Sequence, residues 1–231
     1  MPVAAGGTIR QPELTGPRRF WLVAELTLLF IAAPVGMDWA VHEARVPLFI
    51  ALIPVLVVVV GILALDPTFA LKKELGRGFG WRTLLSILAV FAVGGLGVFA
   101  WLKDTHPDWL FEFARNRPEL WLLVVLAYPF FSVATQEFVY RTFYFHRYGP
   151  LFGDRQGLAI VLNGVLFGFG HIVIGQPFAV IATVFGGCLF AARYAETRSF
   201  WAVFLEHTIW GVFIFTIGLG RYFFTGVSNV G

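Results

Sequence analysis

The chain has 231 residues, of which 58% are hydrophobic and only 13% are charged, and its mean hydropathy is +0.77. A soluble domain carries roughly 25% charged residues, so this composition excludes an ordinary soluble enzyme. The net charge is +3, but Lys and Arg occur in ones and twos between apolar runs, which is typical of membrane loops and argues against a nucleic-acid partner. Cys188 is the only cysteine, which leaves no intramolecular disulfide and no cysteine-based zinc cluster. We therefore expect one all-α integral membrane domain over residues 1–231.

Seven stretches are apolar enough to cross a bilayer, which takes about 20 residues as a helix. In chain order they are 20–37, 46–65, 83–102, 120–148, two spans within 156–192 and 200–219. Pro129 predicts a kink in the fourth, and Gly175-Gln176-Pro177 separates the fifth from the sixth. The pattern predicts a multi-pass helical bundle in which spans over 19–119 precede a core over 120–220.

The distribution of positive charge predicts the orientation of these spans. Of the 17 Lys and Arg residues, 12 fall on the N-terminal tail and the second, fourth and sixth loops, and 5 fall on the other side. Positively charged loops stay in the cytoplasm, so we expect a cytoplasmic N-terminus. Membrane lipid is then the surrounding partner, and tryptophans near the predicted span ends are typical of an interfacial belt.

Six ionisable residues fall inside the predicted spans, where each one is a functional hypothesis because a charge in hydrocarbon costs at least a few kcal/mol. They are Glu25, Glu137, Arg141, His171, Glu206 and His207. Glu25 has no neighbour that forms a motif with it, and we expect it to reach the interface or to pair with another helix.

The other five lie on three spans and admit structural readings as well as functional ones. Glu137 and Arg141 are four residues apart, so they share a helix face and form either a structural ion pair or part of a site. His171 follows a glycine-rich run in which glycines four apart favour close helix packing, and it either bonds across such a contact or acts in a site. Glu206 and His207 are adjacent and point about 100° apart, so we expect Glu206 to orient an arginine or an imidazole.

The depths of these residues agree with a shared site. At about 1.5 Å per residue, Glu137 lies about 13 Å, His207 about 12 Å and His171 about 21 Å from their predicted helix ends, a spread that helix tilt accommodates. One glutamate and two histidines can activate water as general base and electrostatic partners, or by holding a divalent metal such as zinc. The residues alone leave both cofactor alternatives open.

These residues resemble motifs of the glutamic-type intramembrane proteases that include CAAX prenyl endopeptidases and bacterial Abi proteins, the CPBP family. Glu-Glu-x-x-x-Arg is matched by Gln136-Glu137-x-x-x-Arg141, and Phe-x-x-x-His by Phe167 and His171. His-x-x-x-Asn is matched in part by His207 and Gly211. The resemblance covers roughly residues 120–220 and implies a bacterial or archaeal cell membrane.

Two positions depart from the family pattern. The resemblance assigns water activation to the first glutamate, which here is Gln136, and oxyanion binding to the asparagine, which here is Gly211. Glutamine cannot accept a proton at physiological pH and glycine has no side-chain donor. The base role then falls to Glu137 or Glu206, unless the chain keeps the scaffold without the protease.

Three functions follow from these residues. The first is an intramembrane endopeptidase that cleaves a membrane-associated peptide or protein, with Glu137 deprotonating or orienting water, Arg141 stabilising its charge, and His171 and His207 completing the site. The second is a catalytically silent protein that binds a membrane partner in an immunity or chaperone-like role. The third, a transporter or proton relay, predicts interrupted spans in corresponding positions of a repeat, and we see no repeat.

Overall fold

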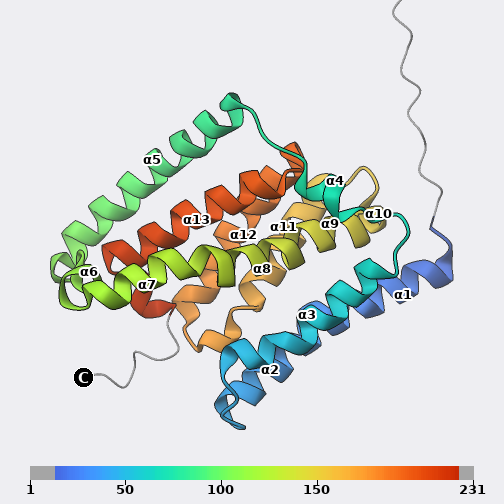
Figure 1. The fold of residues 1–231 in the computed structure, drawn as a ribbon, viewed down its shortest axis with the longest axis horizontal. Coiled ribbons are helices and arrows are strands. Elements are labelled where there is room, and N and C mark those ends of the chain that lie inside the picture. Colours follow the sequence, from blue (N-terminus) through green and yellow to red (C-terminus); the bar gives the residue numbers. More distant parts are fainter. Residues whose placement is uncertain (1–13, 224–231) are drawn as a thin grey trace, which may run out of the picture.

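The computed structural model describes residues 14–223, and this part of the chain is helical with no strand (Figure 1). The first part contains α1 (Gly16–Thr27), η1 (Leu28–Ala32), α2 (Ala33–His42), α3 (Leu48–Ala64), α4 (Leu71–Leu75), α5 (Trp81–Thr105), η2 (Pro107–Trp109) and α6 (Glu112–Asn116). The next part contains α7 (Pro118–Tyr128), η3 (Pro129–Val133), α8 (Ala134–Glu137), η4 (Phe138–Phe143), α9 (Tyr144–Arg147) and α10 (Gly149–Phe152). The last part contains α11 (Gln156–Phe169), η5 (Ile172–Ile174), α12 (Pro177–Thr197), α13 (Phe200–Ile217) and η6 (Leu219–Tyr222).

Six continuous helices in the described part are long and apolar enough to cross a membrane, which agrees with an all-α multi-pass bundle. The expected seventh, over 46–65, is shorter: α3 begins only at Leu48, after Pro47, and has 17 residues. At about 1.5 Å per residue this is about 26 Å, below the roughly 30 Å of a hydrocarbon core. Of the N-terminal tail that entered the charge count, Arg10 lies outside the described residues, whereas Arg18 and Arg19 lie on α1.

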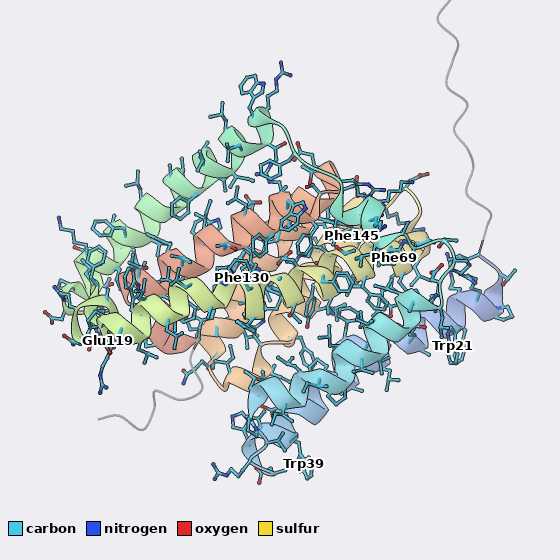
Figure 2. The ribbon with its side chains drawn as sticks, viewed as in Figure 1. Trp21, Trp39, Phe69, Glu119, Phe130 and Phe145 are labelled. Carbon is cyan, nitrogen blue, oxygen red and sulfur yellow. The ribbon has the colours of Figure 1, made fainter. Side chains whose placement is uncertain are left out.

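The outside of the bundle is apolar, as a lipid-facing surface requires. Phe130, which Figure 2 labels on the α7–α8 helix, is 70% exposed, and Phe185 on α12 is 73% exposed. Trp21 and Trp39 are also exposed, and Figure 2 shows them at opposite ends of the continuous α1–α2 helix. Exposed apolar surface on this scale would aggregate in water, so the chain is an integral membrane protein.

Helix α13 is the centre of the bundle. It contacts α5, α7, α8 and α12 (Figure 1). The N-terminal helices are joined to the end of the fourth long helix by an aromatic cluster around Phe30, which packs edge-on against Tyr140, Tyr144 and Tyr148. Phe30 is only 1% exposed, so this cluster fixes the position of the segment that follows Glu137.

Glycine residues allow α11 and α12 to pack with their backbones in contact. A Cβ at Gly168 would lie 2.8 Å from the Val180 carbonyl oxygen and 3.0 Å from the Val184 nitrogen. A Cβ at Gly164 would lie 2.7 Å from the Cys188 nitrogen. The close approach is therefore the reason for glycines at both positions, and it sets the place of the turn that carries His171.

Gly168→Ala is expected to destabilise the protein by about 1–3 kcal/mol, because the added methyl group forces α12 away. The matched control is Gly157→Ala on the same helix, where a Cβ meets nothing within 4 Å and where alanine is the better helix former. Thermal unfolding in detergent measures both. Equal stability of the two variants would contradict the role of the close contact.

Candidate active site

The fourth long helix, Pro118–Arg147, presents the first motif through two π-helical segments. The first begins at Pro129, which has no N–H to donate to the preceding turn. The second, η4, starts directly after Glu137 and contains Arg141. Asn163 of α11 donates from Nδ2 to the Tyr140 carbonyl at 2.6 Å and so braces this segment. Such widened turns re-aim side chains and often mark functional sites.

Glu137 is fully buried, with its two carboxylate oxygens facing different partners. Oε2 lies 3.2 Å from Arg141 Nε, a distance that makes an ion pair although the angle does not make a hydrogen bond. Oε1 accepts a hydrogen bond of 2.7 Å from His207 Nδ1. The carboxylate therefore lies behind the imidazole, with one oxygen toward Arg141 and the other toward His207.

Arg141 is fully buried as well and is held by both charge and aromatic faces. Its guanidinium carbon lies 4.4 Å from the centre of the Phe167 ring, and Nη2 donates to the Gly187 carbonyl at 3.2 Å. Contact with a ring face stabilises a desolvated cation. Phe167 thus supports the positive charge that balances Glu137.

His207 lies on α13 between Glu137 and Tyr128. Its ring stacks on Phe190 with centroids 4.6 Å apart and an interplanar angle of 20°. Since Nδ1 donates to the Glu137 carboxylate, only Nε2 faces the other side, and it lies 3.0 Å from the Tyr128 hydroxyl. The imidazole is held at both nitrogens and on its face, which gives it one orientation.

His171 lies in the turn between α11 and η5. Its Nδ1 is 2.7 Å from the Phe167 carbonyl oxygen, which can only accept, so Nδ1 carries a hydrogen. In a neutral ring Nε2 is then an acceptor. The Phe167 ring meets His171 edge-on at 4.7 Å and His207 at 5.7 Å, so the two histidines flank one phenylalanine.

A cavity of about 1320 Å³ brings these groups together. Its polar lining includes Tyr128, Gln136, His171 and His207, and most of the remaining lining is apolar. Phe131 and Phe185 line the same cavity and are 72% and 73% exposed, so the space reaches the outer surface of the bundle. A hydrophobic chain in the bilayer can meet the two imidazoles there.

Gln136 and Gly211 also line this cavity. Gln136 Nε2 donates to the Ser132 hydroxyl at 2.8 Å, and its buried Oε1 has no hydrogen-bond partner in the described part. The amide can therefore accept a hydrogen bond from a bound group, but it cannot take up a proton. The position that carries the water-activating glutamate in the resemblance is thus occupied by an amide that cannot act as a general base.

The two remaining glutamates do not line the cavity but form ion pairs elsewhere. Glu206 is buried and receives two hydrogen bonds from Arg193, at 2.9 and 3.2 Å. Glu25 receives two from Arg147, at 2.9 and 2.8 Å, and one from Tyr148 at 3.0 Å. Glu206 is therefore paired with Arg193 away from the cavity, which does not favour the base role that the sequence left open for it.

The metal alternative for Glu137, His171 and His207 does not fit this geometry. Among residues 14–223, no three His, Cys, Asp or Glu side chains are grouped to hold a metal ion. Both oxygens of Glu137 and Nδ1 of each histidine already have protein partners. We therefore derive no chemistry through a metal.

Tyr128 is the residue of this site that sequence reasoning missed. It lies 79 residues before His207 in the chain and on a different helix, so its pairing has no local signal. The available signal was indirect: a glycine at position 211, where the resemblance calls for a side chain, implies that another residue fills the space.

Together the fold and the site define an integral membrane protein with a buried Arg–Glu–His chain beside an apolar cavity. Residues 118–213 match the family described as Type II CAAX prenyl endopeptidase Rce1-like, so this segment is similar to the CAAX proteases. The segment includes Tyr128 and all three motifs. No curated protein and no solved structure matches the chain.

Proposed function

We propose that this protein is an active intramembrane endopeptidase of the CAAX protease family in which His171 activates water. The observation that carries the proposal is the pair of histidines on one apolar cavity, with Nδ1 of His171 bound to a carbonyl so that Nε2 is free to accept a proton. A positioned general base is typically worth 10²–10⁴ in rate. Residues 120–220 form the catalytic core in this proposal, and 19–119 the surrounding spans.

The reaction begins when Nε2 of His171 accepts a proton from water while the water oxygen bonds to the peptide carbonyl carbon. The π electrons of the carbonyl move to its oxygen and form an oxyanion. When this intermediate collapses, the C–N bond breaks and His171 returns the proton to the leaving nitrogen. Gln136 orients the water through its unpartnered Oε1.

Glu137 and Arg141 act through His207. The carboxylate accepts from Nδ1 of His207 and so fixes which nitrogen faces the cavity, while Arg141 stabilises the carboxylate. Glu137 is a positioning residue in this scheme.

The lining of the cavity favours a peptide that carries a lipid. Apolar side chains such as Leu123, Phe131 and Phe185 line the side that reaches the exterior, and a prenyl chain next to the scissile bond would lie against them. We further propose that the N-terminus lies in the cytoplasm, on the distribution of Lys and Arg, and that the membrane is that of a bacterial or archaeal cell, as the resemblance implies.

A second function is favoured by one specific observation, the glutamine at position 136 inside the cavity. A chain that keeps the scaffold but lacks the glutamate would bind a lipid-modified or membrane-embedded partner without cleaving it. The two functions differ in whether the wild-type chain cleaves a peptide substrate.

Wild-type protein and Gln136→Glu, each in phospholipid vesicles, are compared on a farnesylated peptide and on the same peptide without the lipid. We expect the wild type to cleave the farnesylated peptide, because His171 supplies the base. Gln156→Glu on exposed α11 surface is the matched control for the added charge and should cleave as the wild type does. Cleavage by Gln136→Glu with none by the wild type would show that the wild type is catalytically silent, as the second function requires, and no cleavage by either would also contradict the protease.

A further inference from the structure

Tyr128 occupies the space in which a side chain at position 211 would begin. A Cβ built on Gly211 would lie 2.5 Å from the Tyr128 hydroxyl oxygen and 2.6 Å from Cζ of the ring, both shorter than a van der Waals contact. Gly211 is one helical turn beyond His207, so a side chain there would extend next to the imidazole. The phenol and any residue larger than glycine at 211 therefore exclude each other.

The phenol is held beside the His207 imidazole in the wall of the cavity. Its hydroxyl lies 3.0 Å from His207 Nε2, and Tyr128 lines the cavity. The ring packs edge-on against Phe215 at 5.3 Å and against His207 at 6.1 Å. Since Tyr128 is the last residue of α7 before the π-helical turn at Pro129, the backbone that aims it is part of the same irregular helix as Glu137.

We propose that Tyr128 is the oxyanion donor of this protein and replaces the side chain that Gly211 lacks. With hydrogens on both ring nitrogens, His207 donates from Nδ1 to Glu137 and from Nε2 to the phenol oxygen. The phenol hydrogen is then free to donate to the oxyanion of the intermediate. No bond is made or broken in this step, and the negative charge is stabilised at the end of the chain Arg141, Glu137, His207, Tyr128. The inference rests on the proposed hydrolysis.

Tyr128→Phe keeps the ring and removes only the hydroxyl. The loss of one oxyanion donor costs about 10²–10³ in kcat, and we expect a loss of this size with KM and the melting temperature nearly unchanged. Tyr194→Phe, on α12 outside this cavity, is the matched control and should keep the wild-type kcat. A purely structural tyrosine would lower the melting temperature and leave kcat of the folded fraction unchanged.

The exclusion between the two side chains gives a rescue experiment. Tyr128→Ala opens the space, and Gly211→Asn supplies a new donor, so the double variant should cleave at least about tenfold faster than Tyr128→Ala, given the worth of one donor. Gly211→Asn alone should be impaired, because the asparagine collides with the phenol.

The outcomes separate this inference from the function on which it rests. An active wild type with Tyr128→Phe at full kcat, or a double variant no faster than Tyr128→Ala, overturns the role of Tyr128 and leaves the protease intact. A wild type that cleaves nothing overturns the proposed hydrolysis, and the assignment of Tyr128 falls with it.

Discussion

Replacing His171 with alanine is expected to lower kcat/KM for a membrane-associated peptide by about 10²–10⁴, the typical contribution of a general base. The effect is large because Gln136 cannot take over as base, and Glu137 is buried behind His207 with both oxygens engaged. Cleavage in phospholipid vesicles, with initial rates over a range of peptide concentrations, measures it.

The matched control for His171→Ala is His106→Ala, which removes an exposed imidazole near the end of α5 that stacks on Trp109. It should retain wild-type kcat/KM. If His171→Ala retains wild-type activity while it remains folded, His171 is not the base, and water activation must be assigned to another group of the cavity.

Arg193→Met or Glu206→Leu alone is expected to destabilise the protein by about 3–5 kcal/mol. Arg193 is only 6% exposed and Glu206 is fully buried, and removing one partner leaves an uncompensated charge inside the bundle. Arg193 also donates to Ser86 at 3.1 Å, so the pair joins α12 and α13 to α5. Denaturant unfolding in detergent micelles gives the free energies.

The double variant, Arg193→Met with Glu206→Leu, should cost much less than the sum of the two single variants, because apolar side chains of similar volume replace a buried ion pair with little loss. Its activity should stay near that of the wild type, since neither residue lines the catalytic cavity. Additive losses of stability would show that the two charges do not interact.

The sequence predicts which segments are helices and which residues belong to the candidate site better than it predicts which side chains contact one another. Apolar runs locate the long helices because a bilayer imposes their length, and Pro129 marks the irregular turn of the fourth. Glu137, Arg141, His171 and His207 stand out because ionisable groups are rare in such spans. The types and spacing of these residues are visible in the sequence, so the motifs can be recognised without a structure.

Pairings between distant helices depend on side-chain direction, which the sequence does not fix. Arg193 counted as a loop residue in the charge distribution, whereas α12 continues to Thr197 and buries it against Glu206. Glu137, the last residue of α8 before the π-helical turn η4, faces His207 and does not line the cavity. Tyr128 and His207 lie 79 residues apart in the chain and on different helices, so only the structure reveals their contact.

The proposed hydrolysis is tested most directly by cleaving a farnesylated peptide in heavy-oxygen water and identifying the products by mass spectrometry. Wild-type protein in vesicles should yield a new carboxyl terminus that carries one solvent oxygen, and His171→Ala should yield little or none in the same time. If the wild type binds the peptide but releases no labelled product, the chain is a binding protein on a protease scaffold.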